Sequence, residues 1–307
     1  MAMLLADVGG TNARLALARN GVIDGASVTR YRGENYASFD DVVRTYLTEQ
    51  DNPRLTAVCV AVAGPVSGGR AELTNRDWDF SEDRLARLTD ADQVRLINDL
   101  TALGYATPHL GDDGASLLRA APAHRARNGQ ALVVGAGTGF NLCSLRRLPG
   151  GGVTCMEAEE GHTNLPVNIW RRLAARVGEG RMAPFFSTEE VFAGRGLARM
   201  YQVMHDEEMP AEAISTAAAE GNPKAEETCQ LFAELLGMEL RELALRFMPL
   251  EGIFLAGSVA RSFAHRTQAL ESALLAEPYM RHIPENTPLL LIRDDMAALL
   301  GCLAAID

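Results

Sequence analysis

An acidic residue and a run of glycines follow the first apolar segment of the chain. The segment from Met3 to Ala6 is apolar, Asp7 comes next, and Gly9-Gly10-Thr11 follows it. A carboxylate at a strand end suits a hydrated Mg²⁺, which keeps several waters and takes few carboxylates. Glycines in a hairpin let backbone N–H groups approach a phosphate directly. The alternative interpretation is a tight turn that Asp7 caps, without any ligand.

A second glycine loop repeats this pattern later in the chain. The segment LVVGAGTGFNLCSLRR has an apolar run, a glycine turn and an alternating run, and Gly137-Thr138 matches Gly10-Thr11. Its GxGxG spacing and the strand-like residues after it disfavour a dinucleotide site, which needs a helix N-terminus there. Two such loops, both with a Thr hydroxyl, favour phosphate binding and predict a duplicated architecture.

Two polar clusters could act on a second substrate. Asn98-Asp99 ends the apolar run Val94 to Ile97, just before a predicted helix. A helix cap and a ligand-binding carboxylate at a strand end explain this pair equally well. The segment from Glu157 to His162 holds three carboxylates and an imidazole, without a Cys or second His at metal-binding spacing. It is either a solvated acidic loop or a sugar site, where charged acceptors match vicinal hydroxyls.

The elements that would position these residues alternate between strands and helices in the first third of the chain. Apolar runs predict buried strands, amphipathic runs predict helices, and this alternation indicates an α/β fold with a parallel component. The second half is mostly helical and ends in a strand and a helix. The predicted strands are Leu55 to Ala63, Val94 to Ile97, Ile253 to Ala256 and Leu289 to Ile292; the predicted helices are 40–50, 80–88, 168–177, 188–205, 211–219, 224–248 and 296–306.

Composition excludes several classes of protein. The chain has 307 residues and a net charge of −11, which disfavours a nucleic-acid partner because phosphate neutralisation needs a basic face. Its only lysine is Lys224, in a polar stretch, which excludes a P-loop NTPase, a protein kinase and a pyridoxal enzyme. The five cysteines form no CxxC. We find no signal peptide and no membrane span, so we expect a cytoplasmic protein with no membrane partner.

Six segments together resemble the bacterial glucokinase family of the hexokinase–Hsp70–actin ATPase fold. In family order they are DVGGTNARLAL, LINDLTALGYA, GAGTG, EEGHTNLP, TEEVFAGRGL and FLAGSVAR. The resemblance implies a two-domain actin-like ATPase (ribonuclease H-like) α/β fold with its active site in the interdomain cleft. We place a small domain at 1–107 plus 288–307 and a larger one at 108–287. The implied activity is an ATP- and Mg²⁺-dependent transfer to the 6-hydroxyl of glucose, a glycolytic step, by a protein that is commonly a homodimer.

The resemblance also implies a role for each matching residue. Asp99 corresponds to the general base that takes the hydroxyl proton. The implied sugar contacts are Asn98, Glu159, His162 and Glu189. The implied nucleotide contacts are Ala6, Asp7, Val8, Gly9, Gly10, Thr11, Gly137, Thr138, Gly139 and Gly257, with Asp7 as the magnesium ligand.

The chain departs from the family pattern in the second half. Phe140-Asn141 follow the second loop where the family has Leu-Gly, and Arg195 stands where the family has Pro between two glycines. The zinc-binding Cys cluster of the related repressor–kinase family is absent from the sequence. A kinase for another hexose is one alternative. The other is a catalytically weak sugar-binding or regulatory protein derived from a kinase, which the Phe140 ring beside the phosphate loop would suggest.

Overall fold

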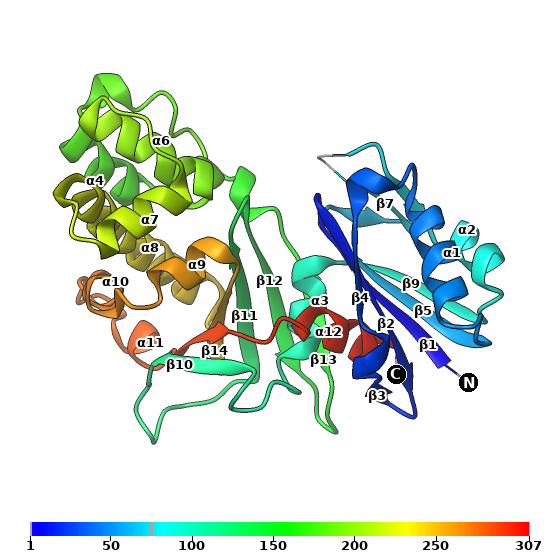
Figure 1. The fold of residues 1–307 in the computed structure, drawn as a ribbon. Helices are drawn as coiled ribbons and strands as arrows, with labels where there is room; N and C mark the ends of the chain where they lie inside the picture. The colour runs from blue at the N-terminus through cyan, green and yellow to red at the C-terminus, as the bar shows by residue number, and fades with distance from the viewer. Residues whose placement is uncertain (1, 74–75, 307) are drawn as a thin grey trace. The chain divides into compact units, whose positions relative to one another are not determined.

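The computed structural model describes residues 2–73 and 76–306, in two compact units (Figure 1). Unit 1 comprises 1–111, 148–157 and 294–307, and unit 2 comprises 112–147 and 158–293. Residues 1, 74–75 and 307 fall within the predicted domain ranges but outside the described residues. None of the described helices is long and apolar enough to cross a membrane.

The main sheet of unit 1 has the order β3-β2-β1-β5-β9, and β4 pairs with β2. Strands β1, β5 and β9 are parallel, whereas β1 and β2 form an antiparallel hairpin. A small antiparallel sheet, β6-β7-β8, lies beyond β5 in the chain. The strands are β1 (Ala2–Val8), β2 (Asn12–Arg19), β3 (Val22–Ile23), β4 (Thr29–Arg32), β5 (Leu55–Val62), β6 (Val66–Ser67), β7 (Arg70–Glu72), β8 (Asp79–Ser81) and β9 (Gln93–Asn98).

Helices cover both faces of this sheet because its buried strands carry apolar side chains on both sides. Alternate residues of β1 show the division: Leu4 packs in the cluster with α1 (Phe39–Glu49) and α2 (Glu82–Thr89), whereas Leu5 packs with α3 (Asp99–Ala106) and α12 (Ala297–Ile306). Figure 1 shows the two helix pairs on opposite faces.

The C-terminal helix α12 is central to unit 1. It packs closely on α3, where a Cβ on Gly301 would lie 1.7 Å from the Ala102 carbonyl oxygen, so only glycine fits. The Cys302 thiol donates to the Ala6 carbonyl at 3.4 Å, directly behind the first glycine loop. The last helix of the chain thus supports the strand that carries Asp7.

Unit 2 contains five strands in the order β10-β15-β14-β11-β12, with helices packed against one face of them. Strands β11 and β12 form an antiparallel hairpin, and β14 is parallel to β11. The strands are β10 (Ala115–Arg119), β11 (Gln130–Ala136), β12 (Phe140–Arg147), β14 (Gly252–Ala256) and β15 (Leu289–Ile292). The helices are α4 (Val167–Val177), α5 (Glu189–Phe192), α6 (Gly194–His205), α7 (Ala211–Ala219), α8 (Pro223–Phe247), α9 (Ser258–Phe263), α10 (Thr267–Leu274) and α11 (His282–Glu285).

Two segments group differently from the predicted domain ranges. The range 288–307 was expected in the small domain, but β15 lies between β10 and β14 in unit 2, because its apolar run is buried by pairing on both sides. Residues 148–157 were expected in the larger domain, but they belong to unit 1. There the strand β13 (Val153–Glu157) packs on α3, and Thr101 Oγ1 donates to Glu157 Oε1 at 3.2 Å.

Two predicted helices also differ in their bounds. The helix expected from Phe80 begins at Glu82, because Phe80 pairs in β8 and the Ser81 side chain caps the helix. The single helix expected over 188–205 consists of α5 and α6, with extended backbone at Ala193 between them.

Candidate active site

The first glycine loop lies at the carboxyl ends of three parallel strands. Val8, Val62 and Asn98 end β1, β5 and β9 and are in register with one another. The hairpin continues from Val8 through the loop, where the Gly9 N–H donates to the Asn12 carbonyl at 2.9 Å. Sheet pairing therefore places the predicted residues Ala6 to Thr11 at the same edge as Asn98-Asp99. This is the edge where open α/β sheets bind ligands.

Asn98 caps the helix that carries Asp99. Its Oδ1 accepts from the Leu100 N–H at 2.9 Å and the Thr101 N–H at 3.4 Å, and its Nδ2 donates to the Gly64 carbonyl at 3.1 Å. The capping role that the sequence left open is thus present. The Asn98 side chain also hydrogen-bonds to the Asp99 carboxylate, which lowers the pKa of that group.

The two carboxyl groups at this edge, Asp7 and Asp99, both have pKa values above the usual value of an aspartic acid. Burial, together with the smaller effect of the nearby Asp7 charge, raises the pKa of Asp99 to about 7. The Leu100 N–H, 2.9 Å from Asp99 Oδ1, opposes this rise in pKa. Burial also raises the pKa of Asp7, while the charges of Arg14 and Arg30 lower it. Paired carboxyls with perturbed pKa values in one site are typical of acid–base chemistry.

The donor set at Asp7 fits a magnesium ion that is shared with a phosphate. Asp7 offers one carboxylate at this edge of the sheet, and the charges of Arg14 and Arg30 act on it. No cluster of three or more possible metal ligands occurs among the described residues. A protein cage for a metal is thus not built here, whereas Mg²⁺ normally takes one or two carboxylates, substrate phosphates and waters.

The second glycine loop is held by two further glycine segments of unit 2. The Gly137 N–H donates to the Gly139 carbonyl at 2.9 Å, and the Gly137 carbonyl accepts from the Gly194 N–H at 2.8 Å. Gly257 has a φ of 97°, and a Cβ on it would lie 2.3 Å from the Ala136 carbonyl oxygen. Only glycine permits that approach and that backbone angle. The predicted residues Gly137, Thr138, Gly139 and Gly257 are thus brought together.

Phe140 does not project into the second loop. Its side chain is 1% exposed and its ring packs on Phe192, with ring centroids 5.3 Å apart. In the sequence alone, this ring follows the phosphate loop and suggests a disturbance of phosphate binding. The alternation of β12 turns it into the hydrophobic core instead, because Phe140 follows the turn on the buried face.

The predicted sugar-binding residues of unit 2 lie around a short 3₁₀ turn, Glu160–His162. Glu159 and His162 are both exposed, with Glu159 Oε2 4.0 Å from His162 Nε2. The Asn141 Nδ2 donates to Glu159 Oε2 at 3.1 Å, and Asn141 Oδ1 accepts from the Glu160 N–H at 3.0 Å. A Cβ on Gly161 would lie 2.1 Å from the Phe140 carbonyl oxygen, so the turn is pressed against β12.

Glu189 lies against both the second loop and this turn. Its Oε2 accepts from the Phe140 N–H at 2.8 Å, and its Oε1 pairs with Arg195. Cβ atoms placed on Gly139 and Gly161 would lie 2.7 Å and 3.3 Å from Glu189 Oε2. Unit 2 therefore gathers the three predicted sugar residues Glu159, His162 and Glu189 beside the predicted phosphate loop.

The chain was also compared with known proteins. A family model described as glucokinase matches residues 4–307.

The chain belongs to the glucokinase family. The resemblance found in the sequence is thus confirmed, and with it the kinase and transferase class of the chain.

Individual relatives of this glucokinase-family chain cover nearly all of it. The glucokinase of Marinobacter nauticus is 29% identical over 99% of this chain and 96% of the relative. The crystal structure of a glucokinase from an Antarctic psychrotroph has a TM-score of 0.85 at 28% identity, covering 99% of this chain and 98% of the other. A ROK family glucokinase from Streptomyces griseus, in complex with glucose and AMPPNP, has a TM-score of 0.58 at 19% identity and covers 98% of each chain. These likenesses confirm the α/β fold of the actin-like class.

Sequence reasoning missed the basic residues that hold the acidic turn of this glucokinase-family chain. Glu160 is 7% exposed and pairs with Arg246 of α8, while Thr163 Oγ1 donates to the Glu160 carbonyl at 2.8 Å. The acidic segment alone gave no sign of Arg246, because the partner lies 86 residues away in the chain.

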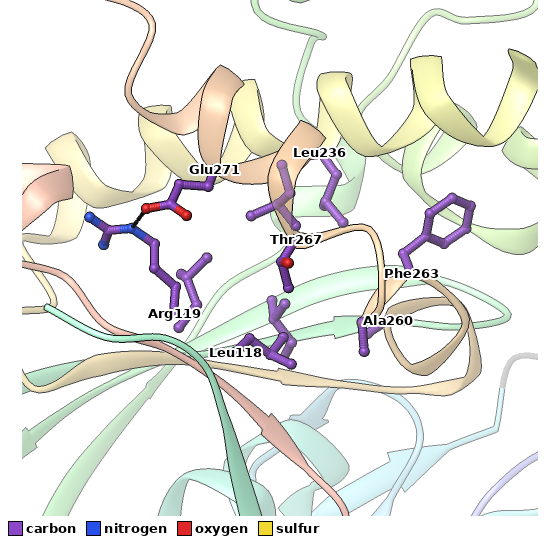
Figure 2. A pocket seen from close by; sticks show the side chains of 11 residues that line it. Leu118, Arg119, Leu236, Ala260, Phe263, Thr267 and Glu271 are labelled. Atoms are coloured by element: carbon purple, nitrogen blue, oxygen red, sulfur yellow. Dashed lines mark hydrogen bonds and ion pairs between the residues drawn. The ribbon is translucent and has the colours of Figure 1, made fainter.

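An apolar cavity in unit 2 lies apart from these residues. It has a volume of about 10 Å³ and is lined mainly by apolar side chains of β10, β14, α9 and α10. Figure 2 shows the Arg119–Glu271 pair at its edge, where Arg119 Nε lies 3.0 Å from Glu271 Oε1. A cavity of this size has room for about one water and none for a sugar.

Proposed function

We propose that this protein is an ATP-dependent glucokinase, which transfers the γ-phosphoryl group of ATP to the 6-hydroxyl of glucose. The observation that carries the proposal is the Asp7–Asp99 pair at the carboxyl ends of parallel strands, with a pKa of about 7 for Asp99. A carboxylate near that pKa can take a hydroxyl proton at neutral pH and then release it. Phosphoryl transfer otherwise needs positioning and charge stabilisation, which the two glycine loops can supply without a lysine.

The proposed roles follow the geometry of each unit. In unit 1, Asp99 takes the proton of the 6-hydroxyl, and Asn98 beside it contacts a sugar oxygen. Asp7 would hold Mg²⁺, which supplies charge neutralisation of the phosphates when bound. The backbone from Ala6 to Thr11 then offers N–H groups to the phosphates.

Unit 2 supplies the remaining proposed contacts. Glu159, His162 and Glu189 accept hydrogen bonds from sugar hydroxyls, and His162 can also donate one. Gly137, Thr138 and Gly139 face the phosphates, and Gly257 faces the adenosine. We propose that both sets act on the same sugar and nucleotide, as two-domain closure in this family implies. The burial of the Phe140 ring away from the loop weighs against a weakly catalytic sugar sensor.

Further expectations about assembly, location, partners and substrate stay part of the proposal. On the family resemblance, we propose a homodimer in the cytoplasm and no nucleic-acid or membrane partner. We also propose glucose as the preferred hexose, since the residues that match the family's sugar contacts, Asn98, Glu159, His162 and Glu189, are present.

The test is a coupled assay for glucose 6-phosphate with Mg·ATP, beside a panel of hexoses and with ADP and polyphosphate as alternative donors. We expect turnover on glucose with ATP in the ordinary enzyme range, on the order of 1–10³ s⁻¹. Preference for another hexose or donor would correct the substrate alone. Glucose binding without turnover on any sugar would overturn the proposed kinase.

A further inference from the structure

Arg195 occupies an unusual place at the start of α6, where its three kinds of donor each meet a different acceptor. Nη2 donates to Glu189 Oε1, Nε donates to Glu190 Oε1 at 3.0 Å, and Nη1 donates to the Thr138 carbonyl at 3.4 Å. Thr138 belongs to the second glycine loop, and Glu189 is a proposed sugar contact. One guanidinium therefore connects both proposed binding elements of unit 2.

The Glu189 carboxylate needs such a partner because it is mostly withdrawn from water. Its side chain is 17% exposed and lies within the reach of Gly139 and Gly161, both of which have no side chain to hold it in place. A buried carboxylate is costly unless it is paired and hydrogen-bonded. The Phe140 N–H holds one oxygen at 2.8 Å, so Arg195 holds the other. A planar guanidinium fixes orientation as well as charge.

The neighbouring Glu190 increases the stabilisation that a cation provides at this position. Two adjacent carboxylates repel each other, and Arg195 lies between them with a bond to each. Burial alone would raise the pKa of Glu190, but hydrogen bonds from Arg199 and Arg195 hold it below its usual value. Proline, which the family has at this position, offers no side-chain donor, so this contact is a feature of Arg195 in this chain.

We infer that Arg195 is a positioning residue for the sugar: it holds the Glu189 carboxylate against the second loop in the orientation that accepts sugar hydroxyls. This inference rests on the proposed function, which makes Glu189 a sugar contact. Its contact with the loop is secondary, because the loop has its own backbone bonds from Gly194 and within Gly137–Gly139.

The test compares KM for glucose, KM for ATP and kcat in Arg195→Gln, Arg195→Lys and the wild type. We expect Arg195→Gln to raise the KM for glucose about tenfold, as loss of a hydrogen bond to a charged group does. The KM for ATP should change less than about threefold, because the loop contact is the weaker one. Arg195→Lys should recover part of the glucose affinity, since lysine restores a positive charge beside Glu189 but lacks the planar guanidinium.

Arg199→Gln is the matched control. Arg199 lies one turn further along α6 and pairs with Glu190 and the Pro184 carbonyl, but with neither Glu189 nor the loop. We expect its KM for glucose to stay within about twofold of wild type. An equal rise in Arg199→Gln would show that general loosening around Glu190 is responsible, and would overturn the inference.

A double-mutant cycle with Glu189→Gln completes the test. If Arg195 acts through Glu189, adding Arg195→Gln to Glu189→Gln should raise the KM for glucose much less than in the wild-type background. Independent, multiplying effects would overturn the inference, as would an unchanged KM for glucose in Arg195→Gln alone. A wild type without turnover on any hexose would overturn the proposed function itself and, with it, the sugar role of Arg195.

Discussion

The two glycine hairpins share one topology, but the carboxylates near them lie in opposite kinds of environment. In each, the first strand is antiparallel to the second and parallel to a later one: β1 with β2 and β5, and β11 with β12 and β14. In the second residue pair from the loop, Asp7 lies opposite Arg14 in the first hairpin. At the same place in the second hairpin, Gly135 lies opposite Asn141. The first hairpin thus carries a charge where the second has no side chain.

This difference separates the two requirements of a kinase. In unit 1, burial raises the pKa values of Asp7 and Asp99, and the Asp7 charge adds to the rise at Asp99, which favours proton transfer. In unit 2, Glu159 and Glu189 are each held by a donor, from Asn141 and Arg195. A carboxylate whose orientation is fixed by a donor favours recognition of hydroxyl groups. The same hairpin therefore serves reactivity in one unit and geometry in the other.

The largest expected effect is on turnover in Asp99→Asn. Because the amide cannot take the hydroxyl proton, we expect kcat to fall by about 10²–10⁴-fold while glucose still binds. The coupled assay measures kcat, and calorimetric titration measures glucose binding. A kcat within tenfold of wild type would show that unit 1 does not supply the base, and the comparison of the hairpins would fail.

The pH dependence of the same pair of proteins sharpens the assignment. Since Asp99 must be deprotonated, kcat/KM of the wild type should rise with pH through about 7. The Asp99 carboxyl binds its proton more tightly in the folded state than in the unfolded state. This group therefore makes the stability of the fold decrease as pH rises from about 4 to about 7. Asp99→Asn has no such loss. Its melting temperature, relative to that of the wild type, should therefore increase between pH 5 and pH 8. A constant difference would contradict the raised pKa.

A smaller effect is expected on stability in Glu239→Gln. Glu239 of α8 is fully buried, and neither carboxyl oxygen has a hydrogen-bond partner among the described residues. Burial raises its pKa to about 8, Arg246 opposes this, and Glu160 and Glu242 add to it. The wild type should therefore lose stability as pH rises from about 5 through about 8, roughly 1 kcal/mol of it above pH 7, and the variant should not.

Thermal unfolding at pH 5, 7 and 9 measures this effect. The kcat profile of Glu239→Gln should match that of the wild type, because this carboxyl touches none of the proposed contacts. Raised pKa values would then matter for stability alone in unit 2 and for catalysis in unit 1. A shifted kcat profile in this variant would remove that distinction.

The smallest expected effect is on sugar affinity in Asn141→Ala. The variant removes the donor that holds Glu159, a loss of about 1 kcal/mol, so the KM for glucose should rise about fivefold with little change in kcat. Asn168→Ala is the matched control, because its Nδ2 makes the same kind of bond to Glu242 Oε1, at 3.2 Å, away from the site. An equal KM for both variants would show that Glu159 needs no such support.

Local patterns were enough to predict most elements of both hairpins. The apolar run before Asp7 and the alternation after Gly137 became β1 and β12, because burial on a sheet imposes those periods. The strand end at Asn98-Asp99 was likewise visible, and its cap was one of two interpretations that the sequence left open. Short strands such as β10 and β13 were missed, since they contain too few alternating residues to stand out from loops.

Contacts between distant segments could not be predicted in this way. Arg195 was visible only as a departure from the family pattern, and its bonds to Glu189 and Thr138 depend on how α6 meets the loop. The direction of the Phe140 ring depends on which face of β12 is buried. The placement of β15 in unit 2 likewise depends on pairing with β14, more than 30 residues earlier in the chain.

The position of α12 bears on how the protein is made. Its Gly301 and Cys302 complete the packing behind β1. Strand β1 is synthesised first, but its packing is complete only after α12, near the end of the chain, has been synthesised. Unit 2 draws only on residues 112–147 and 158–293, and can close its core earlier. A chain cut short before Ala297 would therefore lack the support of Asp7 while keeping unit 2 whole, which ties catalytic competence to the completion of synthesis.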